Sequence, residues 1–142
     1  MTTVRQQHEA SASRAGLAVF AALVAASAYG GAFGLIAGLL DLGAVVTARL
    51  PLHSPVLGGL ALATLVALPF SLLARYAWRG DRRCDRAELV AGLLLVGWIL
   101  IELAFIRQVT LFHPVYLVIG TALAWLGYQA SGQYQPPNVP TK

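Results

Sequence analysis

A single glutamate, Glu102, interrupts the apolar segment GWILIELAFIRQ, which runs from Gly97 to Gln108. A charged side chain at the centre of a bilayer costs roughly 2.5–3.5 kcal/mol on insertion scales, and less near the ends of a helix. The cost of placing Glu102 in the bilayer is lower if its carboxyl group is protonated, pairs with a cation, or reaches interfacial water. Proton and cation binding are also the chemistry of coupled transport, so Glu102 is the first candidate for a functional side chain.

Glu102 belongs to a set of polar residues that we expect at one end of a membrane bundle. The set comprises Asp41, Arg49, His53, Glu102, Arg107 and His113. Arg107 lies about 140° around a helix from Glu102, so a pair requires the helix to end near Ile106. Arg49 and His113 are alternative partners. We interpret the set either as a salt-bridge network that closes this end of the bundle or as a ligand or proton site.

The spacing of these residues does not indicate any particular reaction. His53 and His113 are imidazoles of a kind that binds metals, but no local motif accompanies them. The chain also lacks the GxSxG, HExxH and P-loop patterns. Its one cysteine, Cys84, excludes an intrachain disulfide. We therefore expect no metal site, no cofactor and no catalytic residues, and an enzyme is not the favoured class.

The composition indicates an integral membrane protein. The 142 residues are 58% hydrophobic and 11% charged, whereas soluble domains carry about 25% charged residues. A helix needs roughly 17–25 residues to cross the hydrocarbon core. Four apolar stretches are candidates for spans, at 15–40, 56–74, 89–106 and 114–130. The predicted fold is therefore an all-α membrane protein, a single bundle of four transmembrane helices.

Helix-start patterns support these breaks. Ser54 before Pro55 predicts an N-cap followed by proline at the first helical position. Residues 85–88 read as a capping box that opens the third helix. Pro114 is expected at the start of the fourth helix, and Pro69 is expected to kink the second. The predicted helix starts therefore lie at the boundaries between the apolar spans.

The segment between the first two spans, from Asp41 to Leu50, is short and mainly apolar. We expect it to form a short interfacial helix that is capped by Asp41 and lies along the membrane surface.

The distribution of cationic residues predicts the orientation. Eight of the ten Lys and Arg residues fall on one side, namely Arg5, Arg14, Arg75, Arg79, Arg82, Arg83, Arg86 and Lys142. The positive-inside rule places both termini in the cytoplasm, in a multi-pass protein of the bacterial cytoplasmic (inner) membrane. Residues 1–14 are then a cytoplasmic N-terminal segment, 15–130 the transmembrane domain and 131–142 a disordered cytoplasmic tail.

The arginine-rich loop between the second and third spans has two interpretations. It sets the topology, and its side chains can also bind anionic lipid headgroups. The headgroup candidates are Arg79, Arg82, Arg83 and Arg86. Because the cluster is short and lies between apolar spans, it does not indicate nucleic-acid binding. The expected partner is the lipid bilayer.

Three glycines one turn apart, Gly30, Gly34 and Gly38, predict a smooth face on the first helix. Such a face permits close backbone approach. It would pack either within the chain, for example against Gly120 and Ala124, or against a second copy or a larger membrane complex.

The stretch from Leu50 to Gly127 resembles a widespread group of small bacterial membrane proteins with four predicted helices, of the high-GC Gram-positive type. The shared motifs are Leu50-Pro51-Leu52, Ser54-Pro55, the arginine-rich loop, Gly97-Trp98-Ile99-Leu100-Ile101-Glu102 and Pro114-x-Tyr116. The group has no established function, so the resemblance implies a topology and carries over no activity.

Three functions are compatible with these patterns. The leading hypothesis is a non-enzymatic accessory or scaffold component in which Glu102 closes a structural polar network. The second is an oligomeric small-solute or proton-coupled transporter that uses Glu102. The third is a membrane redox or enzyme subunit, which requires a cofactor site that the sequence does not supply.

Overall fold

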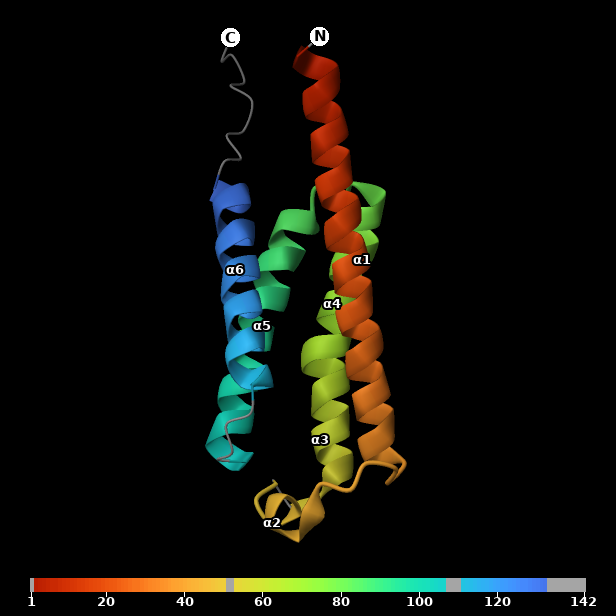
Figure 1. Ribbon diagram of the computed structural model, residues 1–142, viewed down its shortest axis with the longest axis vertical. Helices are drawn as coiled ribbons and strands as arrows, with labels where there is room; N and C mark the ends of the chain where they lie inside the picture. The colour runs from red at the N-terminus through yellow and green to blue at the C-terminus, as the bar shows by residue number, and fades with distance from the viewer. Residues whose placement is uncertain (1, 51–52, 107–110, 133–142) are drawn as a thin grey trace, which may run out of the picture.

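The computed structural model describes residues 2–50, 53–106 and 111–132, with side chains from residue 12 onward except at 106 and 112. Every regular element in these ranges is helical, which confirms the all-α prediction. The elements, shown in Figure 1, are α1 (Thr2–Ile36), α2 (Gly43–Thr47), α3 (Pro55–Leu62), the π-helix η2 (Ala63–Ala67), α4 (Leu68–Arg79), α5 (Cys84–Ile106) and α6 (Phe112–Gly132).

Three helical stretches are long and apolar enough to cross a membrane. They are Ala12–Ile36, Pro55–Arg79 and Cys84–Phe105, with mean hydropathies of 1.9, 2.2 and 2.1. Their outward surfaces carry large apolar side chains, such as Leu23 and Leu93, that no other described part of the chain covers. Burial of such surface requires lipid or another protein, so the membrane class follows from the structure as well as from the composition.

The helices form two groups that touch along a limited seam. One group consists of α1 packed against α3, η2 and α4, and the other of α5 packed against α6. Contacts between the groups are carried mainly by η2 and α4, which meet α5. The start of α1, the end of α6 and the α4–α5 turn lie at one end of the molecule, and α2 lies at the other (Figure 1). This limited seam leaves room for cavities between the groups.

The helix α1 packs through alanines rather than glycines. A stripe at spacings of three and four residues is buried, formed by Ala18, Ala21, Ala25, Ala28 and Ala32. The closest approach is at Gly59 of α3, where an added Cβ would lie 2.8 Å from the backbone oxygen of Ala32. Small side chains on both helices therefore allow the first group to pack tightly.

The three glycines predicted to form a packing face do not share one in this structure. An added Cβ at Gly30 would meet nothing within 4 Å, and at Gly34 it would meet the side chain of Leu40 at 2.7 Å. Gly38 lies beyond the end of α1, with φ of 68°. The helix ends before Gly38 because the glycine adopts the left-handed conformation that commonly stops a helix.

A small-residue interface does exist, between α5 and α6. An added Cβ at Gly92 would lie 2.5 Å from the amide nitrogen of Ala124 and 2.7 Å from the oxygen of Gly120. At Gly127, an added Cβ would meet the backbone of Leu89. Gly120 and Ala124 thus pack against α5, and their proposed pairing with the first helix is wrong. The reason is that small residues permit close approach without selecting a partner.

The helix starts follow the sequence patterns only in part. Ser54 caps α3 as predicted, and its hydroxyl accepts from the amide of Leu57 at 3.4 Å. The capping box at 85–88 is wrong, because α5 already begins at Cys84. Asp81 orders the turn before it and accepts from the amide of Arg83 at 2.9 Å. Asp81 therefore orders the turn that connects α4 to α5.

Near Pro69, where a kink is predicted, the helix changes from α to π geometry over Ala63–Ala67 and back to α at Leu68. Proline has no amide hydrogen, so it breaks the regular hydrogen-bond ladder of the turn that precedes it. The η2 segment ends two residues before Pro69. Thr64 within it donates its hydroxyl to the oxygen of Leu60 at 2.8 Å. This segment is part of the seam with α5.

The outer boundaries differ from those predicted. Helix α1 runs from Thr2 to Ile36, so it includes most of the N-terminal segment 1–14 and ends before residue 40, the predicted end of the first span. Helix α6 begins at Phe112, so Pro114 lies in its first turn, and it continues to Gly132. The remainder of the predicted tail, residues 133–142, lies outside the described residues.

Candidate functional site

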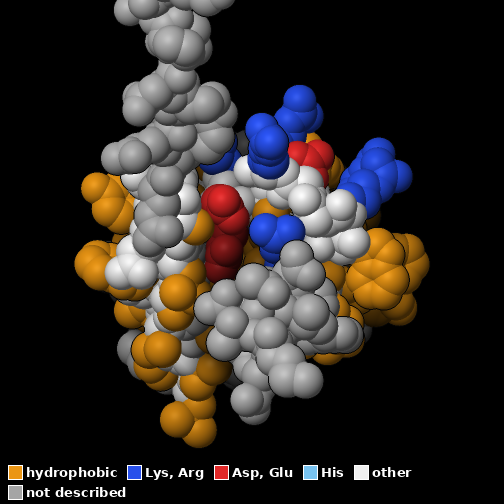
Figure 2. Space-filling view, turned by 90° about the horizontal axis from the view of Figure 1, so that it is seen from above, with side chains coloured by type: hydrophobic (Ala, Val, Ile, Leu, Met, Phe, Trp, Pro, Cys, Tyr) orange, Lys and Arg blue, Asp and Glu red, His pale blue; other side chains and the backbone are white. Residues whose placement is uncertain are grey.

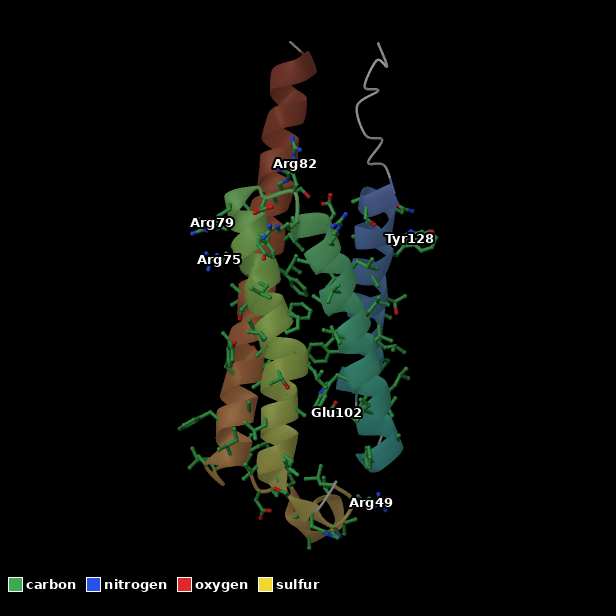
Figure 3. The ribbon with its side chains drawn as sticks, turned by 180° about the vertical axis from the view of Figure 1, so that it is seen from behind. Arg49, Arg75, Arg79, Arg82, Glu102 and Tyr128 are labelled. Carbon is green, nitrogen blue, oxygen red and sulfur yellow. The ribbon has the colours of Figure 1, made fainter. Side chains whose placement is uncertain are left out.

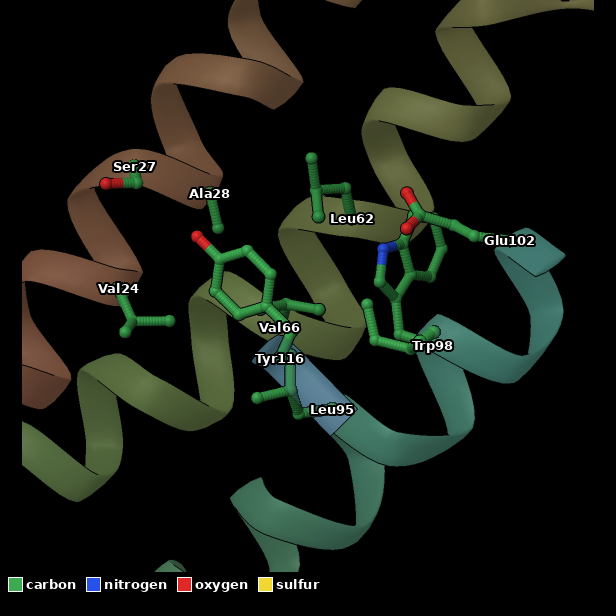
Figure 4. A pocket seen from close by; sticks show the side chains of 10 residues that line it. Val24, Ser27, Ala28, Leu62, Val66, Leu95, Trp98, Glu102 and Tyr116 are labelled. Carbon is green, nitrogen blue, oxygen red and sulfur yellow. The ribbon is translucent and has the colours of Figure 1, made fainter. Parts of the chain in front are cut away.

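Glu102 lies in the last part of α5 between two polar neighbours. The indole of Trp98, one turn earlier on α5, lies beside its carboxylate and lines the same cavity (Figure 4). His113, in the first turn of α6, places Nε2 3.9 Å from the carboxylate oxygen Oε2. The Glu102 side chain is 30% exposed, compared with 11% for His113. The carboxylate is therefore held on one side and still open on another.

One cavity lies between the two helix groups, with Glu102 at its edge. Its volume is about 200 Å³, and every helix of the bundle except α2 and α4 contributes to it. The lining residues are Val24, Ser27, Ala28, Leu62, Val66, Leu95, Trp98, Ile99, Glu102 and Tyr116. Figure 4 shows the Tyr116 hydroxyl directed toward Ala28, with Trp98 and Glu102 side by side at the other end. The walls are mainly apolar, and Glu102 is the one acidic group among them.

A second cavity, of about 300 Å³, lies on the side toward α2. It is lined by Leu35, Leu42, Leu50, Leu57, Gly58, Ala61, Leu62, Trp98, Ile101, Glu102 and Phe105. The two cavities share Leu62, Trp98 and Glu102. The carboxylate therefore stands at the junction of two apolar spaces, at the end of the bundle near Arg49 and opposite Arg79 and Arg82 (Figure 3).

This arrangement suits a small cation with an apolar body. A carboxylate removed from water attracts a positive charge strongly, because the surrounding medium screens little. The rings of Trp98 and Tyr116 add attraction between a cation and an aromatic face. The aliphatic walls favour an apolar body by burial. Among the described residues, no group of three or more His, Cys, Asp and Glu side chains is placed to hold a metal ion.

Of the predicted polar cluster, the described structure brings Glu102 and His113 together. Asp41 instead accepts from the amide of Gly43 at 2.8 Å. The N-cap of α2 is Leu42, which has no side-chain cap, so the predicted capping role of Asp41 is wrong. Arg49 is exposed in the turn that follows α2. His53 is also exposed and has a φ of 53°.

The structure does not place all predicted site residues. Arg107 lies outside the described residues. At the opposite end, Arg82, Arg83 and Arg86 line a hollow, whereas Arg79 points away from the bundle on the outer side of α4 (Figure 3).

Sequence reasoning missed the aromatic lining of the site. Trp98 precedes Glu102 by four residues, a spacing that puts two side chains on one face of a helix. That spacing was a usable signal for a Trp98–Glu102 contact. Tyr116 carried no such signal, because it comes from α6 and reaches the cavity only through the packing of the bundle.

Comparisons with known proteins do not assign the site. The chain matches no family model, no curated protein and no solved structure. The resemblance to small four-helix membrane proteins stays a prediction. A function has to be inferred from the geometry around Glu102.

Proposed function

We propose that the chain is a multi-pass protein of the bacterial cytoplasmic membrane, with α6 as a fourth span and both termini inside. Helix α6 has 21 residues, enough to cross the hydrocarbon core. Large apolar side chains are exposed along it, including Val115, Val118 and Leu126. The gathering of the arginines at the end that holds the start of α1 and the end of α6 supports the orientation (Figure 3).

Within this membrane frame, we propose that the protein binds a small lipophilic cation against Glu102 and acts as a carrier rather than an enzyme. The observation that carries the proposal is the position of a partly exposed carboxylate on the wall shared by two apolar cavities. A carboxylate that serves only structure would be surrounded by its partners. This one has the indole of Trp98 beside it, the imidazole of His113 3.9 Å away and open space next to it.

The energetics favour a cationic ligand over a neutral one. A partly dehydrated carboxylate is costly in an apolar environment unless a counter-charge is present. A bound cation supplies that charge and fills space that the side chains leave empty. Release of the cation to one side of the membrane, with a proton or a second cation taking its place, would make the protein a carrier.

A second candidate function follows from the His113 contact. The 3.9 Å approach of His113 to Glu102 joins the start of α6 to the end of α5. On this alternative, the pair closes the bundle, and the protein is a non-enzymatic accessory or scaffold component. The two candidates differ in what Glu102→Gln does: the carrier loses cation binding, whereas the scaffold loses stability.

The test uses benzyltrimethylammonium, an aromatic cation, and neopentylbenzene, the neutral compound of nearly the same shape. Equilibrium dialysis against purified protein in dodecyl maltoside measures both affinities. We expect saturable binding of the cation to the native chain and a loss of about tenfold or more in Glu102→Gln, because the negative charge that pairs with the cation is removed. The affinity of neopentylbenzene should stay the same in both proteins.

Glu88→Gln is the matched control, because Glu88 is a buried acid of the same helix that lines neither cavity. It should bind the cation as the native chain does. Absence of saturable cation binding in the native chain, or equal binding by Glu102→Gln, would refute the carrier proposal. A lower melting temperature in Glu102→Gln together with unchanged binding would favour the scaffold function.

A further inference from the structure

A hollow of about 620 Å³ opens at the end of the molecule where α1 begins and α6 ends. It is lined by Arg14, Gly80, Asp81, Arg82, Arg83, Asp85, Arg86, Ala130 and Ser131. These residues come from α1, from the α4–α5 turn with the first turn of α5, and from the end of α6. Figure 2 shows basic and acidic side chains gathered on this end, with apolar side chains around the rim. Three separate segments therefore build one polar depression.

The lining carries more positive than negative charge, and the backbone of the turn after α4 fixes its shape. Four arginines face two aspartates, and Asp81 is already used as the acceptor for the amide of Arg83. Gly80 has a φ of 64°, which turns the chain sharply after α4. An added Cβ at Gly80 would lie 3.5 Å from Nη1 of Arg14, so the guanidinium of α1 reaches the turn. Within the described part of the chain, none of the four arginines forms a salt bridge.

Guanidinium groups in this arrangement fit a phosphate. The planar fork of arginine binds phosphate oxygens through paired hydrogen bonds, and several forks around one hollow hold the anion from different sides. The hydroxyl of Ser131 is a further polar group of the lining. Arg75 and Arg79, by contrast, point outward from α4 and do not line the hollow (Figure 3). The chemistry of the hollow is therefore that of a phosphate-bearing ligand.

An apolar groove beside the hollow indicates what carries the phosphate. This groove, of about 240 Å³, lies between α1 and α4 and is lined by Ala18, Val19, Ala22, Ala74 and Trp78. Arg14, Ala18 and Ala22 follow one another at spacings of four residues, so they lie along one stripe of α1. The groove thus starts about one helical turn, roughly 6 Å, below the arginine of the hollow. A ligand with a phosphate and an adjoining hydrocarbon chain fits both features.

We propose that the hollow binds the phosphate headgroup of an anionic phospholipid whose acyl chain lies in the groove between α1 and α4. Basic hollows between membrane helices on the cytoplasmic side are suited to such headgroups. The proposal rests on the proposed membrane orientation, but it involves neither Glu102 nor its cavities. Its failure and that of the cation proposal are therefore separable.

The test measures binding of dioleoylphosphatidylglycerol to the purified full-length chain in dodecyl maltoside by native mass spectrometry, with dioleoylphosphatidylcholine as the neutral reference. We expect saturable binding of the anionic lipid. Arg14→Gln with Arg86→Gln should weaken it by about tenfold or more, because two charge-assisted contacts are lost. Arg75→Gln with Arg79→Gln removes the same charge outside the hollow and should change the affinity by less than about threefold.

Two further measurements identify the source of the phosphate. Glycerol 1-phosphate offers the headgroup chemistry without the chain and should not displace the lipid at equal concentration. Ala22→Phe fills the groove and should weaken lipid binding by about tenfold, because the chain loses its apolar seat. If glycerol 1-phosphate displaces the lipid and Ala22→Phe leaves binding unchanged, the site takes a free phosphate compound and the lipid proposal is wrong.

A conservative pair keeps the test decisive if the glutamine pair does not fold. Arg14→Lys with Arg86→Lys keeps the charge that orients the protein but loses the planar fork. We expect this pair to bind the anionic lipid about threefold to tenfold more weakly than the native chain. The proposal is wrong if the Arg14→Gln/Arg86→Gln pair and the Arg75→Gln/Arg79→Gln pair weaken lipid binding equally. It is also wrong if the Arg14→Lys/Arg86→Lys pair binds the lipid as well as the native chain does.

Discussion

Substitution of Gly92 by alanine tests the packing of α5 against α6 most directly. The added Cβ would lie 2.5 Å from the amide nitrogen of Ala124 and 2.7 Å from the oxygen of Gly120. Carbon atoms in ordinary contact stand about 3.5–4.0 Å from their neighbours, so the helices have to move apart by on the order of 1 Å. Both obstacles are backbone atoms, which cannot rotate away as a side chain can.

The expected change in the free energy of unfolding is the sum of two opposing contributions. Overpacking of a tight interface costs about 1–3 kcal/mol. Replacement of glycine by alanine inside a helix returns about 0.5–1 kcal/mol. We therefore expect Gly92→Ala to lower the free energy of unfolding by about 1–2 kcal/mol. Gly30→Ala is the matched control, because its Cβ would meet nothing within 4 Å and only the favourable helix term remains.

The assay is unfolding in mixed micelles by a titration with sodium dodecyl sulfate, followed by tryptophan fluorescence. Gly127→Ala, in the same interface, should behave as Gly92→Ala does. The double variant should lose less than the sum of the two, since helices already forced apart accommodate the second methyl group more easily. If Gly92→Ala is as stable as the native chain, or Gly30→Ala is equally damaging, the described packing is wrong. A lower mass of Gly30→Ala on a sizing column would instead place Gly30 against a second copy.

Three further outcomes are expected. Gly80→Ala should lower the free energy of unfolding by about 1–2 kcal/mol, because φ of 64° disfavours a Cβ; an unchanged melting temperature would contradict this. Ser54→Ala should lower the free energy of unfolding by about 0.5–1 kcal/mol, because α3 loses its cap. The value is at the low end of the usual range since the bond is 3.4 Å long, and a denaturant titration measures the change. The orientation is tested by cysteine labelling in a variant in which the buried Cys84 is replaced by alanine. Arg79→Cys, at an exposed position, should react with a membrane-impermeant maleimide only after the inner membrane is opened, whereas Val45→Cys, also exposed, should react in intact cells. The reverse pattern would refute the orientation.

The sequence was most informative where the bilayer or local chemistry alone decides the structure. Long apolar runs in a chain that is only 11% charged leave few options other than helices that satisfy their own backbone. The Ser54 cap and the disturbance before Pro69 depend on neighbouring atoms in the chain, and both are present. The predicted start at 85–88 failed because Asp81, outside the assumed helix, orders the turn before α5.

The choice of packing partner was not readable from the sequence. Gly30 and Gly92 are equally small, yet only Gly92 has another helix against it. The buried stripe of α1 is made of alanines, which are frequent on every side of that helix. Which small face is used depends on how the whole bundle is assembled, because packing between membrane helices depends on shape complementarity rather than on hydrophobic pattern.

By itself, the sequence determined that Glu102 is a costly residue near one end of a membrane helix, with His113 among its expected neighbours. Only the tertiary structure decided that the carboxylate stands between two apolar cavities, beside Trp98 and across from Tyr116. The cost of a charge is a property of one residue and its span. A cavity is a property of how two helix groups meet, and here they meet along a seam of η2 and α4 against α5 that leaves the space beside Glu102 unfilled.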